Sequence, residues 1–164
     1  MNAVAILLCP VLLLGPGLRQ QQSLGSNDTF AAAGLTSTEV QEIVAGLERS
    51  AYDAPESWSA ELRAKRVDLG GSRGIILQAT KLLCGGTGNC QLFVFRQERG
   101  HWRSLFENEQ APIAESFQFG PAIAHGIKDL TVVTRMSAVD GQRVTYTFDG
   151  SVYRAKPARS LKEQ

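Results

Sequence analysis

The sequence has little of what enzymes and metal proteins use for chemistry. Its 164 residues include three cysteines and two histidines. Zinc typically takes about four such ligands in paired spacing, and no such set is present. No Gly-Lys-Ser/Thr phosphate loop and no Asp-x-Asp-x-Asp-Gly calcium loop occurs, and no serine is expected at a strand-to-helix nucleophile elbow. These absences favour a domain without a catalytic set, a metal or a cofactor.

An excess of charge and a membrane-spanning run are also missing. Residues 3–14 are almost wholly apolar and precede Gly15-Pro16-Gly17, but a span needs about 20 residues. The pattern predicts a signal peptide over residues 1–20 and a secreted or periplasmic protein. Without Arg19, 17 − 1 = 16 basic residues face 16 acidic ones. Neutrality argues against nucleic acid and anionic membrane as partners, and no stable membrane span remains after cleavage.

The apolar spacing predicts one helix near the start of the mature chain. Residues 21–34 have no sustained period and are expected to form a linker. Thr36 is then followed by Glu39 at the spacing of a capping box. Apolar residues at 40, 43, 44 and 47 form one stripe, which predicts an amphipathic helix that covers one face of a sheet. Residues 35–156 should form a single domain, and 157–164 a flexible tail.

From residue 57 onward the apolar period changes to two, which is typical of strands. Turn sequences separate the runs, including Asp140-Gly141 and Asp149-Gly150, the strongest short hairpin signals. Phe93 and Phe95 share one face of their run and Leu92 and Val94 the other, so this strand should be buried on both sides. The fold class is therefore α+β: an N-terminal amphipathic helix packed on a curled antiparallel β-meander of six to eight short strands.

Two cysteines enclose a glycine-rich stretch between two of these runs. Cys84 and Cys90 remain as an even pair after signal cleavage, which favours a disulfide in an exported protein. A redox pair and a zinc site fit less well, because the spacing is not Cys-x-x-Cys and further ligands are missing. Gly85, Gly86, Thr87, Gly88 and Asn89 would then form a rigid tip between two strands, and glycine loops on stiff scaffolds present their backbone to partners.

This loop, Cys84-Gly85-Gly86-Thr87-Gly88-Asn89-Cys90, resembles a pattern in small exported bacterial proteins of unknown function with a Cys-Gly-x-Thr-Gly-Asn-Cys loop. An aromatic strand at 92–95, a Gly-x-Trp turn at 100–102, an Asp-Leu pair at 129–130 and a final hairpin at 148–153 add to the resemblance, which covers about residues 60–155. It implies export and a β-rich fold, and it implies no activity.

The leading interpretation is an exported, non-catalytic domain that binds a protein or a cell-envelope component as an inhibitor, immunity or accessory protein. Residues 85–89 are the expected contact tip. One alternative is a small secreted hydrolase or metal-assisted enzyme in which Asp129 orients His125 as a general base. Another is a structural envelope protein without a discrete site.

Overall fold

The computed structural model describes residues 21–48, 58–80, 84–107 and 111–162. One α-helix and one short 3-10 helix precede the strands, and ten strands are present in this part of the chain. The helical elements are α1 (Ser37–Glu48) and η1 (Trp58–Glu61). The first five strands are β1 (Leu62–Asp68), β2 (Arg73–Ala79), β3 (Cys90–Glu98), β4 (His101–Ser104) and β5 (Ile113–Ala114). The others are β6 (Ser116–Ala124), β7 (Ile127–Arg135), β8 (Asp140–Phe148), β9 (Tyr153–Ala155) and β10 (Arg159–Lys162).

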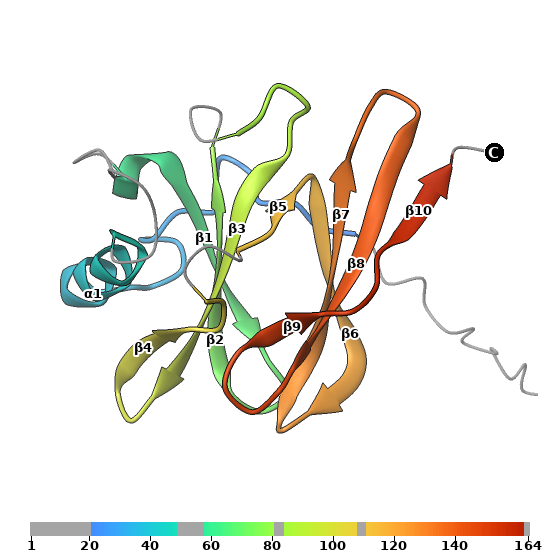
Figure 1. Cartoon of the computed structure of the whole chain (residues 1–164). Helices are drawn as coiled ribbons and strands as arrows, with labels where there is room; N and C mark the ends of the chain where they lie inside the picture. Colours follow the sequence, from blue (N-terminus) through green and yellow to red (C-terminus); the bar gives the residue numbers. More distant parts are fainter. Residues whose placement is uncertain (1–20, 49–57, 81–83, 108–110, 163–164) are drawn as a thin grey trace, which may run out of the picture.

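The strands form two antiparallel sheets instead of one meander. Sheet 1 has the order β1-β2-β3-β4, with β5 paired to β3, and sheet 2 has the order β10-β8-β7-β6, with β9 paired to β8. Figure 1 shows the two sheets facing one another, with α1 on the far side of sheet 1. The α+β, mainly antiparallel architecture is confirmed, but the single curled sheet of six to eight strands is wrong. The helix is also not at the very start, because a folded segment precedes it.

One hydrophobic core fills the space between the sheets. Ile76, Leu92 and Val94 enter it from sheet 1, and Leu130 and Val132 enter it from sheet 2. All five side chains are at most 1% exposed. Alternation along each strand sends the neighbouring side chains to the opposite face.

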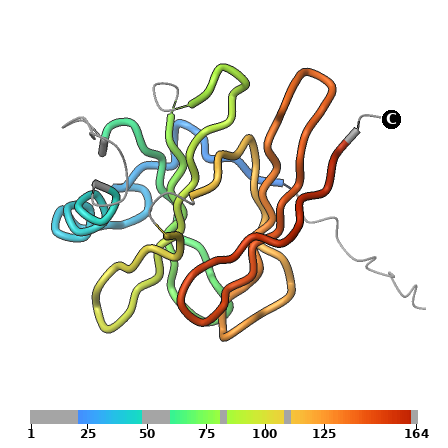
Figure 2. Tube along the Cα trace, viewed as in Figure 1, coloured from blue at the N-terminus to red at the C-terminus, as the bar shows by residue number. Residues whose placement is uncertain are grey.

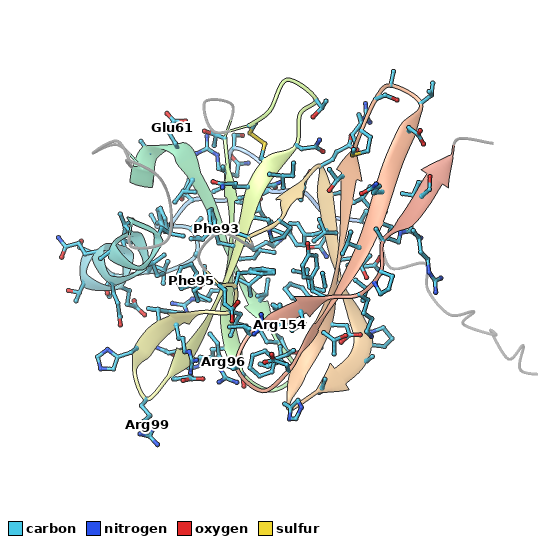
Figure 3. The ribbon with its side chains drawn as sticks, viewed as in Figure 1. Glu61, Phe93, Phe95, Arg96, Arg99 and Arg154 are labelled. Carbon is cyan, nitrogen blue, oxygen red and sulfur yellow. A yellow bond between two sulfur atoms is a disulfide. The ribbon has the colours of Figure 1, made fainter. Side chains whose placement is uncertain are left out.

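A second core lies between sheet 1 and α1. Ile43 and Leu47 of the helix pack near Ile75, Phe93 and Phe95 of the sheet. Figure 3 labels Phe93 and Phe95 on the side of β3 that faces the helix. Sheet 1 is therefore buried on both faces, which confirms the prediction for the strand that carries these phenylalanines.

The start of the helix follows the predicted capping box. The backbone N–H of Thr36 donates to Glu39 Oε2 at 2.9 Å, and the backbone N–H of Glu39 donates to Thr36 Oγ1 at 3.3 Å. The first of these bonds is the main reason why the pKa of Glu39 is lowered. Glu39 also accepts a hydrogen bond from Trp102 Nε1, so the acidic side of the helix holds the edge strand β4.

The segment 21–34, predicted to be a linker, is folded against both sheets. Gln22 exchanges two backbone hydrogen bonds with Phe117 of β6, each 2.8 Å long. Further along, Asp28 accepts from the backbone N–H of Ala64 in β1. This segment therefore joins the edge of sheet 2 to the edge of sheet 1, as the path of the tube in Figure 2 also shows.

The turns agree only in part with the expected hairpins. Asp149 Oδ1 accepts from the backbone N–H groups of Ser151 and Val152, and it closes the β8–β9 turn where Asp149-Gly150 predicted one. Asp140-Gly141 instead lies inside β8, and the turn before it spans residues 136–139. In the confirmed turn Gly150 has a positive φ of 105° and the Asp149 carboxylate accepts two backbone hydrogen bonds, whereas Gly141 has no positive φ.

Two features complete the described chain. Within it, no helix combines the length and hydrophobicity needed to cross a lipid bilayer. Residues 159–162, expected in a flexible tail, pair with residues 140–143 as strand β10.

Candidate functional site

Residues 84–90, which we call the glycine loop, form a tight hairpin turn that leads into β3. The backbone N–H of Gly88 donates to Gly85 O, and the N–H of Gly85 donates to Asn89 O, both at 2.9 Å. Within the loop only Gly88 has a positive φ, of 80°. This is the pattern of a three-residue hairpin loop, in which one left-handed residue follows the turn. Gly88 is therefore required by the turn, whereas Gly86 has open space where a Cβ would lie.

The predicted disulfide joins Cys84 to Cys90 at the base of this loop. The two residues also form an isolated antiparallel bridge, so the sulfurs and the backbone close the same ring. Residues 85–88 lie exposed beyond the bridge. The loop is thus held at its base and open to solvent at its tip.

Asn89 differs from the other expected contact residues, because it is buried at 4% exposure. Its Nδ2 donates to Arg135 O at 2.6 Å, and its Oδ1 accepts from the Arg135 backbone N–H at 2.8 Å. The amide thus forms with Arg135, at the end of β7, the same two hydrogen bonds that the backbone of a neighbouring strand would form. Nδ2 also donates to Thr87 Oγ1 at 2.6 Å. Asn89 therefore fastens the glycine loop to sheet 2 instead of presenting itself to a partner.

A groove of about 720 Å³ lies beside the loop. It is bounded by the loop and its disulfide, by the start of β1 and by the end of β2. The segment before the helix and Glu115, which lies between β5 and β6, complete its wall. The residues that line it are Ser23, Leu24, Gly25, Ser26, Glu61, Arg63, Gln78, Ala79, Thr80, Cys84, Gly85, Gly86, Gly88, Cys90 and Glu115.

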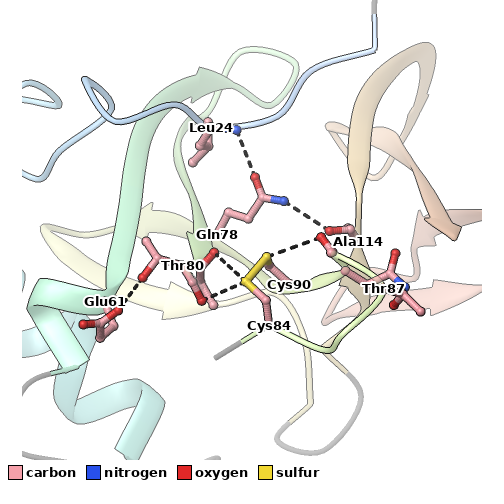
Figure 4. The surroundings of a disulfide bond; sticks show 11 residues. Leu24, Glu61, Gln78, Thr80, Cys84, Thr87, Cys90 and Ala114 are labelled. Carbon is pink, nitrogen blue, oxygen red and sulfur yellow. Dashed lines mark hydrogen bonds between the residues drawn. A yellow bond between two sulfur atoms is a disulfide. The ribbon is translucent and has the colours of Figure 1, made fainter. Parts of the chain in front are cut away.

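A second buried amide, that of Gln78, holds the walls of this groove together. Its Oε1 accepts from the Leu24 backbone N–H at 2.9 Å, and its Nε2 donates to Ala114 O at 3.2 Å (Figure 4). Gln78 is 5% exposed. Sequence reasoning missed this residue, although a lone amide in the apolar run Ile75–Ala79 was a signal, since buried polar groups need partners.

Some polar side chains of the groove already have partners within the protein. Thr80 Oγ1 donates to Glu61 Oε2, and Glu115 forms an ion pair with Arg135 at 2.5 Å. Arg63 lies directly opposite Gln78 across the β1–β2 pair and is half-buried. Among the described contacts its guanidinium has no acidic partner. The groove therefore offers one cation beside an exposed stretch of loop backbone.

Exposed apolar side chains gather near the same end. Four large ones are found in the described chain, and three of them belong here: Ile113 at 52%, Met136 at 55% and Val139 at 66% exposure. Ile113 pairs with Gln91, directly after the loop, and its carbonyl accepts from Thr134 Oγ1. Met136 follows Arg135, which Asn89 holds. These three side chains therefore lie exposed at the end of the molecule that carries the glycine loop.

The residues of the alternative enzyme hypothesis lie at the other end of sheet 2. His125 is exposed in the β6–β7 turn, with a φ of 49°. Asp129 is 8% exposed in β7, and its Oδ2 lies 3.3 Å from Lys156 Nζ. The carboxylate also contributes, after burial, to the raised pKa of Tyr153. The described hydrogen bonds and ion pairs join Asp129 to Lys156 and not to His125.

A Gly-x-Ser-x-Gly pattern does occur, at residues 70–74. It lies in the turn between β1 and β2, so a strand follows the serine instead of the helix of a nucleophile elbow. Asp68 Oδ1 closes this turn by accepting from the backbone N–H groups of Gly70 and Gly71. Ser72 is thus a turn residue in a β-hairpin.

In the part of the chain that the structure covers, no three His, Cys, Asp or Glu side chains are grouped to hold a metal ion. The chain matches no protein-family model, no curated protein and no solved structure with which it was compared.

Proposed function

We propose that the protein is an exported, non-catalytic domain that binds a protein or a cell-envelope component through the tip of the glycine loop and the groove beside it. The proposal depends on one observation. The exposed residues 85–88 are held by the disulfide at their base and by the Asn89 amide on sheet 2. A surface that is ordered before it meets a partner loses less entropy on binding.

The surroundings of the loop favour a macromolecular partner. The exposed apolar side chains of Ile113, Met136 and Val139 extend the contact area beyond the groove. The half-buried Arg63 supplies a cation for a carboxylate or carbonyl of the partner. A protein interface typically combines such an apolar centre with a polar rim.

A bulky side chain on the loop tip tests the proposal. Gly86→Tyr should leave the fold intact, because no atom lies within 4 Å of the added Cβ and the φ of Gly86 is not positive. We expect the tyrosine to block a partner that sits on the loop. In a pull-down from envelope extract, quantified by mass spectrometry, recovery of the partner should fall about tenfold, equal to about 1.4 kcal/mol.

Ala45→Tyr is the matched control, since Ala45 is exposed on α1, on the far side of sheet 1. It should retain the partner fully, and both variants should unfold at the wild-type temperature. Equal recovery with Gly86→Tyr and wild type would show that the loop serves only to close the hairpin. Asn89 is unsuitable for this test, because a substitution there would also loosen the contact with β7.

Export is tested separately by the intact mass of natively isolated protein. We expect a chain that lacks about the first 20 residues, as the leader pattern predicts. Reduction and alkylation should then modify two thiols. A chain that retains the leader and has free thiols would contradict both the location and the proposed role of the loop.

A further inference from the structure

Strand β10 is an edge strand whose outer side is unpaired within the described chain. Its register on β8 pairs Arg159 with Arg143, and Leu161 with Gly141. Lys156 N–H donates to Thr145 O, so the odd-numbered residues of β8 turn their peptide groups toward β9 and β10. The peptide groups of Arg159 and Leu161 therefore form the hydrogen bonds of the ladder with β8. The peptide groups of Ser160 and Lys162 point away from the sheet, toward the open edge.

Two arginines lie side by side next to this edge. Arg143 and Arg159 are directly opposite one another, so their side chains share the face of sheet 2 that is turned away from the core. Both are exposed, and neither has a carboxylate partner among the described residues. Like charges in directly opposite positions destabilise a sheet.

The neighbouring cations on this face are neutralised. Arg135 pairs with Glu115, and Lys156 pairs with Asp129. The arginine pair is thus a local excess of positive charge in a protein whose formal net charge is only +1. The unpaired backbone groups suit an extended partner, and the arginine pair beside them suits an acidic one.

We propose that the open edge of β10 binds an extended acidic peptide segment of a partner protein as an additional strand. The peptide backbone bonds to the outward peptide groups of Ser160 and Lys162. Because side chains alternate along a strand, acidic residues at every second position lie on the same face as Arg143 and Arg159. Addition of a strand to a sheet edge is an established mode of peptide recognition, and its backbone bonds supply affinity while side chains supply selectivity.

The same charges disfavour the other occupants of such an edge. A second copy of β10 would bring further arginines against Arg143 and Arg159, and charged edges are a common protection against self-association. A polyanion without a peptide backbone would pair with the guanidinium groups and leave the outward groups of Ser160 and Lys162 unused. The acidic peptide satisfies both features.

The test measures binding of a labelled synthetic peptide with glutamate at alternate positions by fluorescence anisotropy. We expect binding that weakens as the salt concentration rises, because exposed charges are screened. Arg143→Gln and Arg159→Gln should each weaken it about two- to fivefold, as is typical of exposed ion pairs. Ser160→Pro should weaken it about tenfold or more, because the outward N–H is lost while the β8 ladder stays intact.

Three controls keep the result specific. Ser160→Thr retains the N–H and should bind as wild type does, and a peptide with glutamine in place of glutamate should bind more weakly. Hydrogen exchange at the amides of Arg159 and Leu161 reports whether β10 stays paired in Ser160→Pro. If it does not, a peptide methylated on alternate backbone nitrogens replaces the variant and should lose binding.

Equal binding of the glutamate and glutamine peptides would overturn the charge selection. Equal binding by Ser160→Pro with β10 in place, or by the methylated peptide, would overturn strand addition. Self-association of the wild type that Ser160→Pro abolishes would assign the edge to a second copy of the chain and would also overturn the proposal.

Discussion

The two sheets use the same kind of strand in different environments. In sheet 1, the central strands β2 and β3 have buried residues in succession, because α1 covers one face and sheet 2 covers the other. In sheet 2, β8 buries little of its first half, and its outer face carries threonines and arginines. Sheet 1 therefore serves mainly as the scaffold. Sheet 2 leaves much of its outer face and the edge at β10 exposed to solvent.

At one end of the molecule, the side chain of Asn89 joins the two sheets beside the backbone links of segment 21–34. Asn89 directly precedes β3 of sheet 1, and its side-chain amide pairs with the backbone of Arg135 at the end of β7. At the opposite end, Arg103 of β4 donates to Ser151 in the β8–β9 turn. Backbone hydrogen bonds also join the sheets there, since the N–H of Lys128 donates to Leu69 O and the N–H of Tyr153 donates to Leu105 O, both at 2.7 Å. Asn89 is therefore one of several contacts that align the sheets.

The largest expected loss of stability is in sheet 1, which is buried on both faces, and a much smaller loss is expected on the exposed face of sheet 2. Phe95 is 1% exposed beneath α1, so Phe95→Ala should lower the free energy of unfolding by about 3–5 kcal/mol. Thr145→Ala, on the outer face of sheet 2, should cost less than about 1 kcal/mol. Urea denaturation with the disulfide intact measures both. Similar losses of unfolding free energy in the two variants would contradict the expected difference between the two sheets.

A medium effect is expected where the sheets meet. Asn89→Ala leaves the backbone N–H and C=O of Arg135 without their partner, which should cost about 1–3 kcal/mol. Thr87→Ala removes only a hydrogen bond inside the loop and should cost less than about 1 kcal/mol. Hydrogen exchange at the Arg135 amide should become faster in the first variant and not in the second. Unchanged exchange in Asn89→Ala would show that other contacts align the sheets.

The smallest effect concerns acid stability, since each sheet has a turn closed by an aspartate. Hydrogen bonds from Val152, Ser151 and Arg154 lower the pKa of Asp149 to about 2 from an ordinary 3.8. A lowered folded-state pKa stabilises the fold above about pH 4, and this contribution disappears as the pH falls toward 2. Asp149→Asn should therefore lose less stability than wild type between pH 4 and pH 2.

Asp68, in the sheet 1 turn, is the matched position. Hydrogen bonds from Lys128 and from the amides of Gly71 and Gly70 lower its pKa well below the ordinary range. Asp68→Asn should likewise lose less stability than wild type as the pH falls below 4. Unfolding midpoints at several pH values measure both variants. An unchanged profile in both would mean that other carboxylates govern the acid response.

Local chemistry made several parts of the fold predictable. The capping box at Thr36 and Glu39, the disulfide between Cys84 and Cys90 and the doubly buried strand around Phe93 all depend on residues close in sequence. In each case the physical reason for the structure lies within about one turn or one hairpin. The exposed tip at residues 85–88 was predictable for the same reason.

The arrangement of the strands was not predictable in this way. Alternation tells which side chains share a face, but it does not tell which strands share a sheet. The contacts that decide this join distant residues, such as Asn89 to Arg135 and Gln78 to Leu24 and Ala114. For that reason Asn89 was expected at the contact tip, and the Gln78 amide was overlooked.

The early segment around Gln22 and Leu24 has a practical consequence for labelling the protein. Because hydrogen bonds to Phe117 and Gln78 anchor it, and because Ser23 and Leu24 line the groove, a reporter domain attached just before Gln21 would be tethered close to the groove. A reporter attached after Lys162 would instead be tethered at strand β10. Comparing the two fusion positions would therefore show, without any substitution, which of the two surfaces a given partner needs.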